Sequence, residues 1–248
     1  TAYHESGHAV LARLLPHCDP VHEVSIIPRG QAAGYTMTRP DNDDNHLTKA
    51  KLLDDIVMSL GGRVAEEIII KDISAGASGD IQAVSKRARL MVTEWGMSER
   101  VGPISYASDK EIFIGRDMAS HVSYSEETAA IIDEEVQKIV GDALKKAREL
   151  LTANKKLLDV MARVLVERET IFSEEVDLIM QGKTAEEVID FMDKNERTLS
   201  NNPFERKSVK IETDAAAKPE QKADDVNFQP EKEEKEQPEN TDSENKDE

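Results

Sequence analysis

Apolar residues recur every three or four positions along most of this chain, which is the spacing of one face of an α-helix. The longest such stretch covers residues 124–153, where Ile132, Val136, Ile139 and Ala143 fall on one face. The same spacing predicts further helices, at residues 1–15, 47–70, 81–95, 157–165, 173–180 and 185–193. Most of the chain is therefore expected to be helical.

A different pattern occupies residues 21–38. Residues 24–27 and 34–37 are predicted to form two short strands around a glycine-containing turn. Gly61 and Gly62 interrupt the helical stretch at residues 47–70, where they favour close backbone packing or a kink. We expect a mainly α fold, with a small β-hairpin or sheet near the N-terminus and a C-terminal helical bundle.

The composition agrees with a helical protein, and the net charge argues against some classes of binding partner. Of 248 residues, 38% are hydrophobic and only 4% aromatic, which disfavours a β-sandwich. The formal net charge of −18 argues against nucleic acid or an anionic membrane surface as a direct partner. No apolar run approaches the roughly 18 residues of a membrane-spanning helix. The single cysteine, Cys18, suits a reducing compartment.

The last part of the chain differs in composition from the rest. Residues 201–248 hold 15 acidic and 8 basic side chains, with prolines and only scattered apolar residues. We therefore expect a folded domain at residues 1–197 and a disordered acidic tail at residues 198–248.

A metal-binding motif lies close to the N-terminus. Residues 4–8 read His-Glu-Ser-Gly-His, a complete His-Glu-x-x-His zinc signature. On a helix, His4 and His8 project from one face, one turn apart, and can both bind one Zn²⁺. Glu5 then lies at the open side of the metal, where it can act as general base. The motif predicts a zinc-dependent hydrolase.

A catalytic zinc needs a third protein ligand, which the motif does not supply. A metzincin would continue the segment with a glycine and a histidine, but Leu11 and Leu14 occupy those places. The candidates are therefore carboxylates from later helices, namely Glu66, Glu67 and Asp80. Helical periodicity alone does not choose among them.

Four ordered sequence blocks resemble the peptidase domain of the FtsH family, the membrane-anchored ATP-dependent zinc proteases. The blocks are residues 2–9 (Ala-Tyr-His-Glu-Ser-Gly-His-Ala), 60–68 (Leu-Gly-Gly-Arg-Val-Ala-Glu-Glu-Ile), 76–81 (Gly-Ala-Ser-Gly-Asp-Ile) and 91–103 (Met-Val-Thr-Glu-Trp-Gly-Met-Ser-Glu-Arg-Val-Gly-Pro). The resemblance extends from residue 1 to about residue 192. It implies a zinc metallopeptidase domain in which Asp80 is the third zinc ligand. It also implies that Glu66 or Glu67 lies next to the metal, without deciding between them.

The resemblance implies partners as well. Family members assemble as homo-hexamers, cleave unfolded or membrane polypeptides, and carry an AAA+ ATPase module and a membrane anchor. This chain contains no phosphate-binding Gly-x-x-x-x-Gly-Lys-Ser/Thr loop, so by itself it is not expected to hydrolyse ATP. The resemblance implies work at the cytoplasmic face of the bacterial plasma membrane, while the chain itself is expected to be soluble.

A purely structural role is the alternative. The long amphipathic helices between residues 124 and 166 could serve as an oligomerisation module that merely retains the zinc motif. A measurement of bound metal distinguishes the two interpretations, because only the peptidase requires it.

Overall fold

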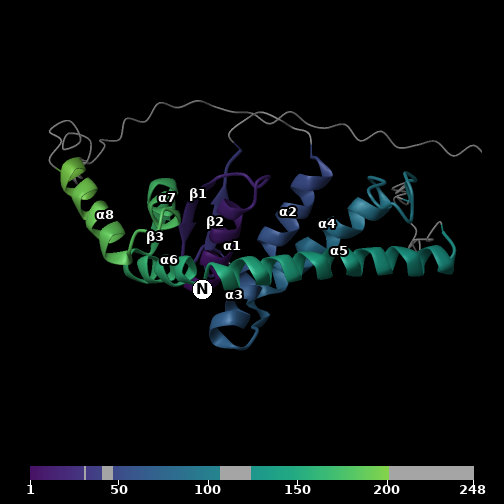
Figure 1. Ribbon diagram of the computed structural model, residues 1–248, viewed down its shortest axis with the longest axis horizontal. Coiled ribbons are helices and arrows are strands. Elements are labelled where there is room, and N and C mark those ends of the chain that lie inside the picture. The colour runs from purple at the N-terminus through teal and green to yellow at the C-terminus, as the bar shows by residue number, and fades with distance from the viewer. Residues whose placement is uncertain (31, 41–46, 107–123, 201–248) are drawn as a thin grey trace, which may run out of the picture. The chain divides into compact units, whose positions relative to one another are not determined.

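The structure is a computed structural model that describes residues 1–30, 32–40, 47–106 and 124–200 (Figure 1). Within these ranges the chain forms eight α-helices, one short 3-10 helix and three β-strands. The expected mainly α fold with a small sheet is therefore confirmed. The predicted tail lies outside the described residues from residue 201 onward. None of the described helices is long and apolar enough to cross a membrane.

Helix α1 (Ala2–Leu14) carries the zinc motif and runs through the core. Its residues from Glu5 to Ala12 are all buried, and it packs against helices α3 and α6. The crossing with α3 is close, because a Cβ atom on Gly7 would lie 2.3 Å from the carbonyl oxygen of Gly61. The two glycines let the helix backbones touch, which fixes the direction in which α1 presents its polar face.

A three-stranded antiparallel sheet lies beside α1. It consists of β1 (Val21–Ser25), β2 (Tyr35–Thr38) and β3 (Thr170–Phe172), in the order β2-β1-β3. Val24 at the centre of β1 is fully buried and pairs with both neighbouring strands. The order leaves β2 as an edge strand on the side of the sheet that meets the start of α1.

Four elements follow the sheet in the chain. They are α2 (Lys49–Ser59), α3 (Gly61–Ile70), the 3-10 turn η1 (Ala75–Ala77) and α4 (Ser78–Thr93). The single interrupted helix expected at residues 47–70 is therefore two helices. Helix α4 begins three residues earlier than predicted, and this places Asp80 in its first turn.

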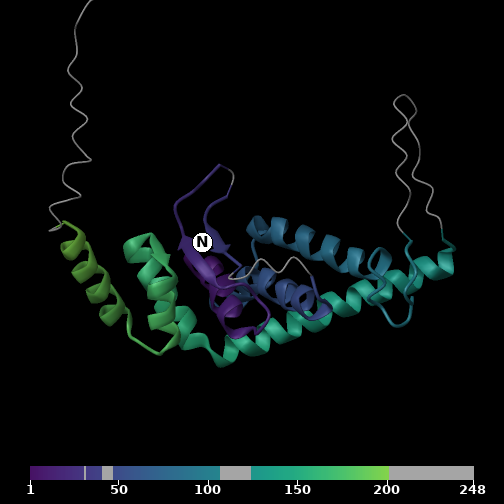
Figure 2. The same ribbon diagram turned by 90° about the horizontal axis from the view of Figure 1, so that it is seen from above.

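The C-terminal half is a set of packed helices. It contains α5 (Glu126–Ala153), α6 (Lys155–Arg168), α7 (Ser173–Met180) and α8 (Ala185–Ser200). Figure 2 shows α4 running alongside α5, and both α2 and α3 also pack against α5. Helix α8 continues past the predicted end of its helix at residue 193 and ends at Ser200.

Candidate active site

The polar face of α1 opens into a cleft of about 580 Å³. The walls come from α1, the start of β2, the end of α2, the middle of α3, the segment between α3 and α4, and the first turn of α4. All the zinc-site residues expected from the sequence line this cleft, namely His4, Glu5, His8 and Asp80. Residues up to 76 positions apart in the chain thus contribute to one site.

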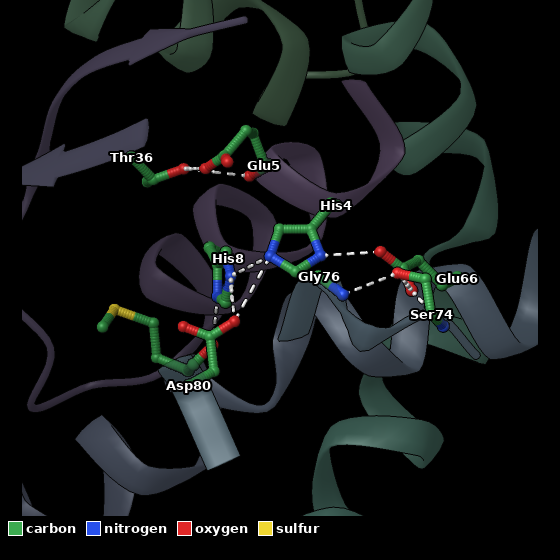
Figure 3. Close-up of polar contacts among 9 residues, drawn as sticks. His4, Glu5, His8, Thr36, Glu66, Ser74, Gly76 and Asp80 are labelled. Carbon is green, nitrogen blue, oxygen red and sulfur yellow. Dashed lines mark hydrogen bonds and ion pairs between the residues drawn. The ribbon is translucent and has the colours of Figure 1, made fainter. Parts of the chain in front are cut away.

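Three side chains converge on one point in this cleft (Figure 3). The Nε2 atoms of His4 and His8 are 3.2 Å apart. Oδ2 of Asp80 lies 3.3 Å from Nε2 of His4 and 3.5 Å from Nε2 of His8. Among the described residues, this is the one group of histidine, cysteine or acidic side chains close enough to share a metal ion.

The outer nitrogen of each imidazole is occupied by a hydrogen-bond partner. Nδ1 of His8 lies 2.9 Å from the carbonyl oxygen of Met58, which can only accept, so Nδ1 is the donor. Nδ1 of His4 lies 2.9 Å from Oε1 of Glu66. In the neutral rings both Nε2 atoms therefore carry lone pairs, and these face Asp80. Three electron-pair donors gathered this closely suit a cation.

Glu66 is fixed in place by the loop that leads into α4. Its Oε2 accepts hydrogen bonds from the backbone nitrogen of Ser74 at 3.2 Å and from the Ser74 hydroxyl at 3.0 Å. The other oxygen remains free to accept from His4. The neighbouring Glu67 points elsewhere and pairs with Arg148 of α5 at the surface. Of the two adjacent glutamates, only Glu66 contacts a site histidine.

In the cluster formed by His4, His8, Asp80 and Glu66, the surroundings favour the ionised form of both carboxylates. Burial opposes charge on His4 and Asp80, but the hydrogen bonds of the cluster outweigh it, so the pKa of His4 is raised and that of Asp80 is lowered. Burial also opposes ionisation of Glu66, whereas hydrogen bonds from His4 and Ser74 lower its pKa overall. Both carboxylates are therefore ionised at neutral pH.

Glu5 lies in the same cleft but makes different contacts. It is 6% exposed, and its Oε2 accepts a hydrogen bond of 2.8 Å from the Thr36 hydroxyl of β2. Within the described residues no hydrogen bond or ion pair joins its carboxylate to His4, His8 or Asp80, so the carboxylate can face a molecule bound in the cleft. The sequence points to Glu5 but not to Thr36, because the strand meets α1 only in the folded chain.

The two other described histidines, His17 and His22, do not line this cleft. His17 bonds the buried carboxylate of Asp54 at 2.8 Å, and His22 belongs to strand β1. His46 and His121 fall outside the described residues.

A known protein family matches the part of the chain that contains this site. The model of the family described as peptidase family M41 matches residues 1–179, which include every member of the cluster. The chain belongs to peptidase family M41. Its M41 relatives include the ATP-dependent zinc metalloprotease FtsH of Veillonella parvula, which is 52% identical over 188 residues. That alignment covers 75% of this chain and 29% of the relative.

Two further relatives are also named as ATP-dependent zinc metalloproteases. FtsH 1 of a Thermoanaerobacter species is 48% identical over 188 residues, covering 75% of this chain and 31% of the relative. FtsH 2 of Alkaliphilus metalliredigens is 43% identical over 239 residues, covering 96% of this chain and 35% of the relative. The chain thus spans about a third of the length of these curated relatives.

Proposed function

We propose that residues 1–197 form a zinc-dependent endopeptidase domain. In this proposal His4, His8 and Asp80 hold one Zn²⁺, and Glu5 is the general base. The observation that carries it is the meeting of three ligand atoms 3.2–3.5 Å apart in a cleft that also contains Glu5. The names of the M41 relatives, which are zinc metalloproteases, support the choice of metal.

The spacing of the ligand atoms supports zinc in particular. Ligands about 2.0–2.1 Å from a tetrahedral ion stand roughly 3.3 Å from one another. The three measured separations are 3.2, 3.3 and 3.5 Å. Two imidazoles and one carboxylate leave a fourth position open, as a catalytic rather than a structural zinc requires.

The chemistry then divides between the metal and the chain. Bound zinc would lower the pKa of a coordinated water and polarise the scissile carbonyl. Glu5 accepts the proton of the attacking water at its carboxylate and returns it to the departing amine. Asp80 and Glu66 supply negative charge that offsets the charge of the ion, and Glu66 and the Met58 carbonyl hold the two imidazoles with Nε2 inward.

The substrate in this proposal is an extended, unfolded polypeptide. Strand β2 is an edge strand that borders the cleft, so its free main-chain groups can pair with an extended peptide. Main-chain pairing tolerates many sequences. We expect a peptide that is N-methylated at alternate backbone amides to be cleaved at least tenfold more slowly than its unmodified counterpart. Equal cleavage of the two peptides would rule out strand pairing.

The assembly and location follow from the family. We propose that this domain works in a homo-hexamer, with an AAA+ ATPase module that delivers substrate, at the cytoplasmic face of the bacterial plasma membrane. The bacterial M41 relatives, which are ATP-dependent and about three times as long as the match, support this arrangement. No contact with nucleic acid and no membrane insertion by these residues is part of the proposal.

Replacement of Glu5 tests the proposed function. Glu5→Gln keeps the size of the side chain but removes its basicity, so zinc content should remain while cleavage of an unfolded protein such as casein falls at least a hundredfold. Glu67→Gln, whose side chain lies at the surface against Arg148, is the matched control and should cleave at the wild-type rate. Full activity in Glu5→Gln would refute the assignment.

A further inference from the structure

The carboxylate of Glu5 is held by the strand that borders the cleft. Oγ1 of Thr36 lies 2.8 Å from Oε2 of Glu5 (Figure 3). Among the described residues this is the side-chain hydrogen bond that the structure gives to the Glu5 carboxylate, and Glu5 is 6% exposed. A buried carboxylate without its donor would lose both a partner and a fixed orientation.

The Thr36 hydroxyl has a second acceptor within reach, which is the backbone oxygen of Glu5 at 3.2 Å. That oxygen lies inside α1, where the amide four residues later already donates to it. A hydroxyl carries one proton, and a charged acceptor forms the stronger bond. The shorter contact to the carboxylate is therefore the main one.

A second residue of the same segment shapes the space around Glu5. Gly34 is buried, and a Cβ atom there would lie 3.0 Å from Cγ of Glu5. It would also lie 2.7 Å from Cγ2 of Thr1 and 2.8 Å from the carbonyl oxygen of Ser25. Positions 34 and 36 share one face of an extended segment, because side chains alternate along a strand. On the face that contacts Glu5, position 34 therefore carries no side chain and position 36 carries a hydrogen-bond donor.

We propose that Gly34 and Thr36 form a seat that holds Glu5 in its working orientation. Gly34 leaves room for the side-chain stem, and the Thr36 hydroxyl fixes the carboxylate. Thr36 is then a positioning residue that acts through Glu5. The inference rests on the proposed role of Glu5 as general base. It gives β2 two tasks, since the strand that offers an edge to the substrate also aligns the base.

Replacement of the Thr36 hydroxyl tests the seat. Thr36→Val keeps the shape and β-propensity of the side chain but cannot donate, whereas Thr36→Ser keeps the donor. We expect Thr36→Val to lower kcat for an unfolded peptide at least tenfold, with KM and zinc content within twofold of wild type. Thr36→Ser should recover most of kcat. Thr93→Val removes a buried hydroxyl that bonds a backbone oxygen of α4, and it should leave kcat unchanged.

A crystallographic comparison supplies a readout that does not depend on catalysis. In zinc-free wild-type protein the Glu5 carboxylate should occupy one position, and in zinc-free Thr36→Val it should shift or split while α1 stays in place. An unchanged carboxylate in Thr36→Val, an unchanged kcat, or an effect on KM alone would overturn the seat.

The outcomes also separate this inference from the proposed function. If Glu5→Gln abolishes cleavage but Thr36→Val cleaves like wild type, the endopeptidase assignment stands and the seat is wrong. If Glu5→Gln stays fully active, the assignment fails, and the crystallographic comparison still decides whether Thr36 orients Glu5.

Discussion

The two zinc-motif histidines are held by different kinds of acceptor. His8 donates to the neutral carbonyl of Met58, and His4 to the ionised carboxylate of Glu66. A carboxylate partner raises the basicity of an imidazole and fixes its tautomer more strongly than a carbonyl does. The affinity of the site for metal should therefore depend on Glu66, although Glu66 is not one of the three converging groups.

The negative charge of Glu66 is expected to strengthen zinc binding through His4. Glu66→Gln retains an acceptor for His4 but loses the negative charge, so zinc affinity should fall about 10- to 100-fold. Competition with a zinc-binding dye measures the change. Glu67→Gln should bind zinc like wild type, because Glu67 bonds Arg148 at the surface. Equal losses in the two variants would show that the contact between Glu66 and His4 does not matter.

The His4 ring packs directly against Gly62. A Cβ atom on Gly62 would lie 2.4–2.6 Å from three atoms of the His4 ring, well inside van der Waals contact. Gly62→Ala should therefore displace the ring and reduce bound zinc to less than half of the wild-type content. Elemental analysis of the purified proteins measures this.

The matched control for Gly62→Ala is Gly141→Ala. Gly141 lies in the middle of α5 with nothing within 4 Å of the added Cβ, so alanine should stabilise the helix by up to about 1 kcal/mol. Zinc content should not change. Full zinc occupancy in Gly62→Ala would show that the ring tolerates the added methyl group.

The sequence predicts the motif residues but not the residues that hold their side chains in place. His4, Glu5 and His8 follow from spacing on one helix, and Asp80 followed from the family resemblance. The choice between Glu66 and Glu67 could not be made, because adjacent helical residues differ by about 100° and the face of α3 that meets α1 is set by packing. The sequence does not predict the contact of Thr36 with Glu5 either, since it forms only across a tertiary interface.

At the scale of elements, one buried carboxylate joins the loop after α1 to two helices. Asp54 of α2 is 4% exposed, and its carboxylate bonds both His17 in the loop and Lys146 of α5 at 2.8 Å. Without these two partners, which are themselves about half exposed, the buried carboxylate would lack compensation. These contacts hold α2 beside α1, and the end of α2 supplies the Met58 carbonyl that orients His8.

The pH dependence of stability tests these contacts. Burial raises the pKa of Asp54, but hydrogen bonds from Lys146 and His17 lower it by more, so the folded-state pKa lies below the unfolded value of about 3.9. Ionised Asp54 therefore stabilises the fold above that value, and the contribution disappears as pH falls through the folded-state pKa. Asp54→Asn should lower the free energy of unfolding at neutral pH by about 1–3 kcal/mol and flatten its decline below about pH 4.

Urea unfolding between about pH 3 and pH 7 measures this difference. Asp190→Asn, at an exposed position of α8, is the control and should follow the wild-type curve. An Asp54→Asn curve parallel to wild type across the whole range would contradict the account.

The hydrophobic pattern predicts the helices but not every strand. The hydrophobic periodicity predicts seven helical stretches, and each of them contains at least one helix in the structure. Strand β3 was not predicted, because it has three residues and its partner β1 lies about 145 residues earlier in the chain. So short a strand carries little pattern of its own, and its pairing is decided by how α6 and α7 pack against the sheet.

At the scale of the whole molecule, the metal would connect distant parts of the chain. Two ligands come from α1 and the third from α4, so zinc bound to them would stabilise the folded state relative to the unfolded one. Removing zinc with a chelator should lower the melting temperature, by about 2–4 °C for each kcal/mol of lost binding free energy. The melting temperature of Asp80→Ala should not respond to the chelator. An identical response in both proteins would contradict a site that includes Asp80.

The most direct test of the zinc site is the metal content of purified protein, measured by elemental analysis for wild type and Asp80→Ala. We expect about one zinc per wild-type chain and a large loss in Asp80→Ala, because two imidazoles alone hold the ion weakly. Wild-type protein without zinc, or equal zinc in the two proteins, would contradict the proposed site of His4, His8 and Asp80.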